Sequence, residues 1–194
     1  NTKDLNCDFL CGSGRKYLRG PRGTGFLFVK EKVLQSLEPI FLDLHSASWK
    51  NSKSYEFIET AKMFECYERN IAAMIGLSTA VQYLATLGID AIEERINHLS
   101  SSLLAELSDL KNITVLERSN HRSGIITFTK SNIEAKILKD ELQKRNINVS
   151  VCRQQNAQLD LGAECTGDVN RVSLHYYNTQ QEVSKFLQAL REIQ

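Results

Sequence analysis

The stretch Asp8–Val29, DFLCGSGRKYLRGPRGTGFLFV, decides how the rest of the chain can be interpreted. Two segments, Cys7–Gly12 and Thr24–Val29, have the composition of β-strands and enclose a loop rich in glycine and arginine. Glycine permits positive φ angles and Pro21 fixes one bend, so the loop is predicted to turn tightly. Lys16 lies at its centre. It is either a surface lysine of a basic hairpin or an amine held ready for chemistry.

The charges around Lys16 do not separate these two interpretations. Arg15, Arg19 and Arg22 lie close to it in the sequence. Lysine becomes a nucleophile when burial or neighbouring cations favour its neutral form. Cations and the amides of a glycine-rich turn also attract anions such as phosphate. The pattern GxxxxGKS/T is absent and no GxGxxG opens a helix, so this is not a standard nucleotide loop. Composition alone favours the basic hairpin.

Composition excludes several classes of function. With 42% hydrophobic and 24% charged residues, the chain is typical of a soluble globular protein. A net charge of +1 indicates neither a nucleic-acid nor a membrane partner, and no apolar run approaches the length of a membrane span. No Cys or His cluster has zinc spacing, so we expect no metal, reduced thiols and a cytoplasmic location. The residues considered are Cys7, Cys11, Cys66, Cys152, Cys165, His45, His98 and His121.

The first half of the chain continues from the hairpin into an irregular segment and a helix. Phe41–Glu59 shows no clear period and carries Trp49 and Tyr55, so we expect it to face a partner or the substrate entrance. Glu68–Leu87 has a roughly helical apolar stripe. Gly88 then interrupts the helical pattern. The chain is therefore predicted to divide into residues 1–88 and 89–194.

The second part has the element order α-β-β-α-β-β-α, which predicts an antiparallel sheet with helices on one face. Asp90 and Glu93 are predicted to form a capping box at the first helix, and Thr179 and Glu182 at the last. Ser131 with Glu134 is predicted to start the middle helix. The predicted strands are Ile113–Glu117, Gly124–Thr129, Ile147–Cys152 and Arg171–Tyr177.

The segment around Lys16 closely resembles the Schiff-base lysine segment of the class V aminotransferase family, the fold-type I enzymes that use pyridoxal phosphate. The family pattern is a small polar residue, Gly, His or Arg, the Lys, a GPxGxG turn and an apolar strand. Further similar segments are Asp43–Trp49, Lys62–Asn70, Ser123–Thr129 and Arg171–Val183. The resemblance therefore extends over nearly the whole chain.

The resemblance implies an α/β fold, the C-terminal part of a fold-type I transferase. Residues 1–88 would be the end of the large cofactor-binding domain, and residues 89–194 a small α+β domain. The chain would belong to a homodimeric enzyme that binds pyridoxal 5'-phosphate and acts on an amino acid. The reaction would be transamination, β-elimination with C–S cleavage, or epimerisation, because one cofactor site supports all three.

The resemblance also assigns roles to four residues. Lys16 would be the lysine of the internal aldimine with the cofactor, and Ser13 and Arg15 would contact the cofactor phosphate. Arg171 would bind the substrate α-carboxylate, which suits its planar, bidentate fork. Without the resemblance, Arg171 would be interpreted as a surface arginine at the start of a strand. His175, predicted on the same face, is either a base or a packing histidine, and the packing role is the one expected.

Two departures from the family pattern limit the assignment. Gln155 stands roughly where cysteine desulfurases carry their catalytic cysteine, and Cys152 lies earlier, at a strand end. This favours the branch that contains isopenicillin-N-epimerase-like proteins and the ergothioneine sulfoxide lyase. The alternatives are a cysteine desulfurase or selenocysteine lyase, and a non-catalytic remnant of the fold that acts as an interaction module.

The second departure concerns residues that the family carries upstream of the lysine strand. These residues stack on the cofactor ring and pair with its pyridine nitrogen, and the chain lacks counterparts for them. The sequence also has no initiator methionine and no signal segment. We therefore expect a C-terminal portion of a longer enzyme, which alone binds the cofactor weakly or not at all and is inactive.

Overall fold

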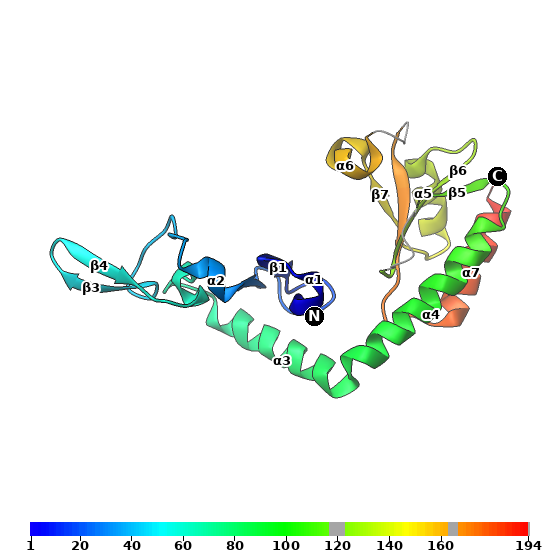
Figure 1. Cartoon of the computed structure of the whole chain (residues 1–194). Helices are drawn as coiled ribbons and strands as arrows, with labels where there is room; N and C mark the ends of the chain where they lie inside the picture. The colour runs from blue at the N-terminus through cyan, green and yellow to red at the C-terminus, as the bar shows by residue number, and fades with distance from the viewer. Residues whose placement is uncertain (117–122, 163–166, 194) are drawn as a thin grey trace. The chain divides into compact units, whose positions relative to one another are not determined.

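A computed structural model of the chain describes residues 1–116, 123–162 and 167–193 (Figure 1). His121 and Cys165 lie outside the described residues. Contacts divide the chain into two compact units, Asn1–Leu87 and Gly88–Gln194, and each is described by itself. Their assignment to the large and small domains of a whole enzyme stays a prediction.

The first unit is built around the predicted hairpin. Its strands pair antiparallel, from Phe9 opposite Val29 to Ser13 opposite Gly25, which confirms both predicted strands to within two residues. The unit contains, in chain order, α1 (Thr2–Leu5), β1 (Phe9–Ser13), β2 (Gly25–Val29), α2 (Glu31–Leu34), β3 (Ala47–Asn51), β4 (Ser54–Phe57), the 3-10 helix η1 (Ala61–Phe64) and α3 (Ile71–Leu87).

The prediction of an irregular segment at Phe41–Glu59 was wrong for its second half. β3 and β4 form an antiparallel hairpin in which Trp49 lies opposite Tyr55. Its turn is held by Asn51, whose Nδ2 donates to Ser54 Oγ at 2.6 Å. Nearly every residue of this hairpin is exposed, so neither strand has a buried face. A strand without a buried face has no apolar–polar alternation, which is the signal that strand prediction uses.

The long helix of the first unit is confirmed, with a later start. α3 begins at Ile71, where Asn70 Oδ1 accepts a hydrogen bond from Ala73 N at 2.9 Å. In the described part of the chain, no single helix is both long and apolar enough to cross a membrane. Only the broken pair of α3 and the following helix, Ile89–Ser108, passes that test, when both are counted together.

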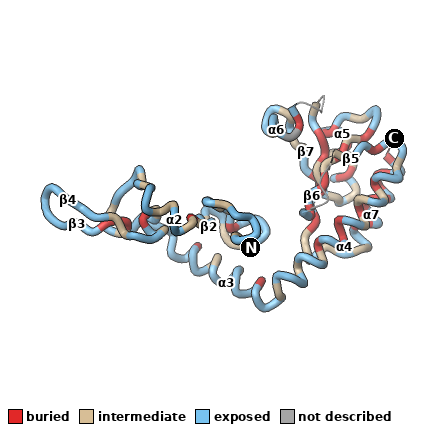
Figure 2. The backbone as a smooth tube through the Cα atoms, in the orientation of Figure 1, coloured by how far each residue is buried: buried red, intermediate tan, exposed pale blue. Residues whose placement is uncertain are grey.

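The second unit is an antiparallel sheet with strand order β5-β6-β8-β7. Residues from the sheet and from three helices form one buried core, which places these helices on one face (Figure 2). The predicted order of elements is confirmed except for a short helix, Gln158–Leu161, between the last two strands. The elements are α4 (Ile89–Ser108), β5 (Ile113–Val115), β6 (Ile125–Lys130), α5 (Ala135–Lys144), β7 (Ser150–Cys152), the 3-10 helix η2 (Gln154–Asn156), α6 (Gln158–Leu161), β8 (Val169–Ser173) and α7 (Gln180–Glu192). The core includes Leu99, Leu103, Phe128, Leu138, Leu142, Leu187 and Leu190.

One predicted capping box is confirmed and one was wrong. At α7, Thr179 accepts from Glu182 N, and the Glu182 carboxylate accepts from Thr179 N at 2.8 Å. At α4 the N-cap is Gly88, with φ of 86°, and no side chain caps the helix. Glycine tolerates this left-handed backbone, so the helix begins before Asp90 and leaves that residue inside the first turn. The middle helix starts at Ala135 rather than at Ser131.

Candidate functional site

The lysine loop is closed by backbone hydrogen bonds at Gly14. Gly14 N donates to Thr24 O at 2.8 Å, and Gly20 N donates to Gly14 O at 2.8 Å. Gly14 is buried, and a Cβ atom there would lie 2.3 Å from Thr24 Oγ1. Glycine is therefore required at this position because the two sides of the loop approach too closely for a side chain.

Helix α3 supports the loop from the same unit. A Cβ atom on Gly14 or Gly20 would lie within 2.9 Å of Leu77 Cδ1, and one on Gly76 would lie 2.7 Å from Pro21 Cγ. The helix and the GP turn are thus in close contact. Sequence reasoning missed Gly76 and Leu77 as positioning residues. The available signal was the glycine in the middle of an apolar helix, which usually has a packing reason.

The structure places the three loop candidates Ser13, Arg15 and Lys16 in one turn. Lys16 N donates to Ser13 O at 3.3 Å, and Arg19 N donates to Lys16 O at 2.9 Å. Arg19 adopts a left-handed φ of 58° where the chain reverses. All three candidate side chains are exposed, and within the described residues Lys16 Nζ makes no hydrogen bond or ion pair. The described unit therefore supplies neighbouring cations but does not enclose the amine.

The hairpin that carries Lys16 should be sensitive to a methyl group at Gly25 and tolerant of one at Gly12. A Cβ on Gly25 would lie 2.6 Å from the backbone oxygen of Gly12, which cannot move away. A Cβ on Gly12 would lie equally close, at 2.6 Å, to the ring of Phe26, but this side chain is half-exposed and can rotate. We expect Gly25→Ala to destabilise the hairpin by about 1–3 kcal/mol. The measurement is amide exchange of β1 and β2 by mass spectrometry, with Gly12→Ala as the matched control. Equal exchange in both variants would contradict the described geometry.

Arg171 lies in β8, an inner strand of the second unit's sheet. Its Cα partners are Thr127 in β6 and Ser150 in β7, and its side chain is half-buried. Within the described residues, the buried Nε of Arg171 has no hydrogen-bond partner. A buried donor without an acceptor is costly, and a carboxylate is the acceptor that fits a guanidinium best. This orphaned atom fits the predicted role as the α-carboxylate ligand, a role that stays a prediction.

The same strand register puts Cys152 on the sheet face that carries Arg171. Ser150 pairs with Arg171, and Cys152, two residues further along β7, pairs with Val169. Cys152 is a half-buried free thiol. Gln155 is exposed in η2, just beyond the strand. A thiol therefore lies near the predicted carboxylate ligand, but earlier in the chain than the position where the family resemblance expects a nucleophile.

His175 is half-buried among aromatic rings. Its ring stacks on Tyr177 at a centroid distance of 4.7 Å and lies 4.5 Å from the ring of Tyr176. The Nδ1 atom of His175 accepts from Tyr176 N at 3.0 Å. These contacts agree with the predicted packing role.

A polar network in the first unit was not foreseen. Asp43 accepts from the backbone amides of Tyr67 at 2.6 Å and of His45 at 2.7 Å, and these bonds lower the pKa of its carboxyl. The Glu65 carboxylate accepts from Arg69 and lies 3.0 Å from His45 Nε2, and the Arg69 hydrogen bond lowers its pKa. The network joins two loops distant in sequence. The described residues contain no group of three or more His, Cys, Asp or Glu that could hold a metal.

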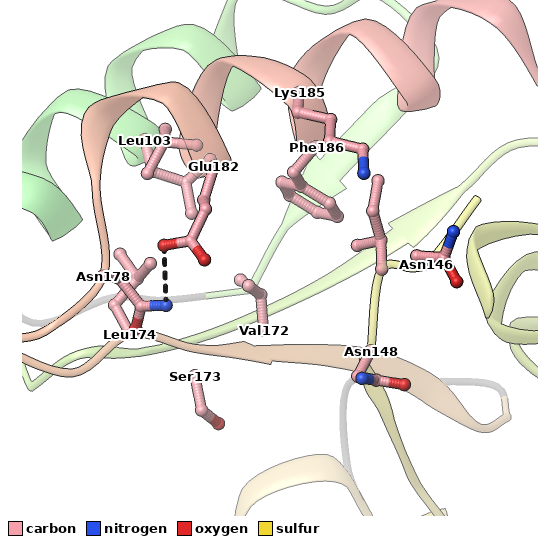
Figure 3. A pocket seen from close by; sticks show the side chains of 12 residues that line it. Leu103, Asn146, Asn148, Val172, Ser173, Leu174, Asn178, Glu182, Lys185 and Phe186 are labelled. Atoms are coloured by element: carbon pink, nitrogen blue, oxygen red, sulfur yellow. Dashed lines mark hydrogen bonds between the residues drawn. The ribbon is translucent and has the colours of Figure 1, made fainter.

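A cavity of about 290 Å³ lies in the second unit, beside β8 and α7 (Figure 3). Val172, Leu174 and Phe186, which belong to the core, form its apolar wall. Glu182 and Asn178 line another side and are joined by a hydrogen bond of 3.3 Å. Arg171 is not among the lining residues. The cavity is therefore separate from the predicted carboxylate ligand.

Comparison with known proteins shows the class of fold. An apo structure of the cysteine desulfurase from Thermococcus onnurineus NA1 matches with a TM-score of 0.86 and 26% identity, covering 99% of this chain and 48% of that one. A mutant of C-DES with glycine covalently linked to its PLP cofactor matches with a TM-score of 0.83 and 20% identity, covering 100% of this chain and 48% of that one. The fold is the α/β fold of fold-type I pyridoxal-phosphate enzymes, as predicted.

The sequence comparisons define the family. Residues 1–186 match the aminotransferase class-V family, and the chain belongs to it. A probable cysteine desulfurase of Methanothermobacter thermautotrophicus is 29% identical over 203 residues, which is 100% of this chain and 49% of that protein. The chain thus spans about half the length of the curated relatives that it matches. These relatives carry the name cysteine desulfurase, and they do not show the epimerase-like and sulfoxide-lyase branch.

Proposed function

We propose that this chain supplies the lysine loop and the carboxylate ligand of a pyridoxal-phosphate-dependent enzyme that acts on an amino acid. Lys16 would hold the cofactor through its amine, and Ser13 and Arg15 would contact the cofactor phosphate. When bound, the cofactor supplies the electron sink for chemistry at the substrate Cα. The amine of Lys16 would move the proton at that carbon, and Arg171 would bind and orient the α-carboxylate.

One observation carries this proposal beyond family membership. The buried Nε of Arg171 has no hydrogen-bond acceptor within the described residues. Buried polar atoms of side chains without a function normally have such a partner in the protein. A bound carboxylate would satisfy this donor together with the rest of the guanidinium fork. The family match covers both Arg171 and the exposed Lys16.

The test of the proposal is chemical trapping on the whole enzyme that contains this chain, because the chain alone is expected to bind the cofactor weakly or not at all. The protein is mixed with pyridoxal phosphate and reduced with borohydride, and the modified peptides are mapped by mass spectrometry. Preferential labelling of Lys16 supports the proposal. Labelling spread evenly over exposed lysines such as Lys53 and Lys62 contradicts it and favours the interaction-module alternative.

We further propose a cytoplasmic homodimer in which the β3–β4 hairpin faces the partner subunit or the substrate entrance. The support is the exposure of its aromatic pair, 72% for Trp49 and 53% for Tyr55. Large exposed aromatic residues are typical of interface centres. Replacing both residues with serine should weaken dimerisation or activity of the whole enzyme. Unchanged sedimentation and unchanged turnover would exclude this role.

The second candidate function is cysteine desulfuration, which the names of the relatives favour. The residues favour C–S cleavage or transamination without a cysteine nucleophile, because Gln155 occupies the expected position and Cys152 lies earlier, at the end of β7. We therefore propose C–S cleavage or transamination without a cysteine nucleophile, as in the epimerase-like and sulfoxide-lyase branch.

Cys152→Ser distinguishes these chemistries. If no cysteine nucleophile is used, turnover of the whole enzyme on cysteine or cystine should change by no more than about twofold. The measurement is release of sulfide and keto acid, with persulfide labelling of the protein in parallel. Gln155→Ala is the matched control in the same segment. Loss of both activity and persulfide label in Cys152→Ser would establish a desulfurase that uses this thiol.

A further inference from the structure

Strands β7 and β8 of the second unit separate before β8 ends. Their pairing stops at Ser150 opposite Arg171, so Asn148 and Ser173, the next positions in that register, are not paired with each other. The cavity of about 290 Å³ is lined by both separated segments and by α7. It therefore lies at the point where the two strands part.

The segment before β7 is held by the end of α5. Arg145 N and Ile147 N both donate to Leu142 O at 3.0 Å, in the last turn of that helix. Asn146 between them has a left-handed φ of 59°, a conformation that asparagine adopts more often than most residues. Because these bonds fix the backbone beside α5, the gap between the strands is a built feature of the fold.

One wall of this cavity is apolar. It is formed by the buried core residues Leu103, Val172, Leu174 and Phe186. Such a wall favours an aliphatic group over water. The volume is at the small end of the range of ligand pockets, so it suits a ligand of amino-acid size.

The α7 side of the cavity carries one acid and one base. Oε2 of Glu182 accepts from Thr179 N at 2.8 Å and from Asn178 Nδ2 at 3.3 Å, whereas its Oε1 makes no hydrogen bond within the described residues. The bond from Thr179 N lowers the pKa of the Glu182 carboxyl, which is therefore ionised at neutral pH. Lys185 makes no ion pair or hydrogen bond in the described part of the chain. One carboxylate oxygen and one ammonium group thus remain available to a ligand.

Glu182 and Lys185 are three residues apart on one helix but form no ion pair with each other. At the same spacing on α5, Lys144 lies 2.6 Å from Glu141. Figure 3 shows the side chains of Glu182 and Lys185 extending from α7 toward β8. Residues three apart on a helix have Cβ atoms about 5–6 Å from each other. A small ligand with an ammonium and a carboxylate on the same carbon can contact both side chains at this separation.

We propose that this cavity binds a free α-amino acid with an aliphatic side chain. The ligand's ammonium group donates to Glu182, its carboxylate accepts from Lys185, and its side chain packs against the apolar wall. A ligand with a single charge leaves either the acid or the base unmatched. Of the described residues that line the cavity, Lys185 alone is cationic, which is too little positive charge for a nucleotide. Lys16 and Arg171 do not line the cavity, so this site is independent of the chemistry proposed above.

The test is a titration of the full 194-residue chain with L-leucine, followed by NMR of the backbone amides. The second unit encloses its own core, so the cavity is formed within this chain. We expect saturable binding with a Kd of about 1 mM or below, and amide shifts concentrated at Ser173, Leu174 and Phe186. L-Leucinamide lacks the carboxylate and 4-methylpentanoate lacks the ammonium, so each should bind about three- to tenfold more weakly. Glycine lacks the aliphatic side chain and should bind about tenfold more weakly or worse.

Two variants test the charged contacts. Glu182→Gln and Lys185→Met should each weaken L-leucine binding about three- to tenfold. Glutamine serves in a capping box as glutamate does, so Glu182→Gln should keep the start of α7 intact. The matched controls are Glu141→Gln and Lys144→Met, which change a charge pair of the same spacing that does not line the cavity. These controls and Arg171→Met should leave the affinity for L-leucine unchanged.

Four results would overturn the proposal. These are absence of saturable L-leucine binding, equal affinity for L-leucinamide or 4-methylpentanoate, unchanged affinity in both Glu182→Gln and Lys185→Met, and loss of binding in Arg171→Met. Thermal unfolding of each variant is measured in parallel. If Glu182→Gln unfolds, Lys185→Met and the ligand series still decide, because Lys185 is exposed and takes no part in the capping box.

Discussion

Lys16→Ala is expected to eliminate the borohydride-trapped pyridoxal phosphate from the peptide that spans the β1–β2 loop. In the whole enzyme, it should also lower turnover by about 10²–10⁴-fold, the usual contribution of a positioned proton-transfer group. The physical reason is that the loop presents Lys16 exposed and free of protein partners within the described residues. Its amine can therefore be captured by a cofactor without first breaking an ion pair.

The measurement compares label on the loop peptide with label on all other lysine peptides. Lys16→Arg keeps the positive charge but removes the reactive amine, so it should also lose the label. Lys30→Ala is the control at the end of the same hairpin, where Lys30 already bonds Asn6 at 2.9 Å. It should keep the label on Lys16. Trapping that persists undiminished in Lys16→Ala would show that the loop is a basic turn without a cofactor role.

Local signals predicted the elements that depend on local interactions. The apolar run of β2 and the Thr179–Glu182 capping box are both complete within a few residues, and the structure contains both. The Asp90 cap was wrong because a left-handed Gly88 at the junction starts the helix earlier. The β3–β4 hairpin was missed because its two exposed faces carry no alternation.

The candidate site was only partly predictable, for a related reason. The family resemblance identified Lys16 and Arg171, but their surroundings depend on contacts between distant segments. The approach of Leu77 to Gly14 and Gly20 joins α3 to the loop, and no local pattern encodes it. The orphaned Nε of Arg171 depends on three strands of one sheet.

Arg171→Met should separate a binding role from a structural one. The buried Nε has no protein acceptor within the described residues, so its removal breaks no hydrogen bond among them. An unsatisfied buried donor destabilises a protein by about 1–3 kcal/mol, so we expect unfolding stability to stay equal or to rise by about 1 kcal/mol. In the whole enzyme, loss of a charged partner for the α-carboxylate should raise KM by about 30-fold or more.

The measurements are thermal unfolding of the ligand-free chain and substrate titration of the whole enzyme. Arg171→Lys keeps the charge but not the planar fork, so its KM should lie between those of the original protein and Arg171→Met. Arg145→Met is the matched control, because Arg145 pairs with Glu192 at the surface of the same unit. Exposed ion pairs contribute at most about 1 kcal/mol, so this variant should change stability little and KM not at all. A large loss of stability in Arg171→Met with unchanged KM would make Arg171 a structural residue. Unchanged stability of the ligand-free protein together with a raised KM is expected only if Arg171 binds the substrate carboxylate.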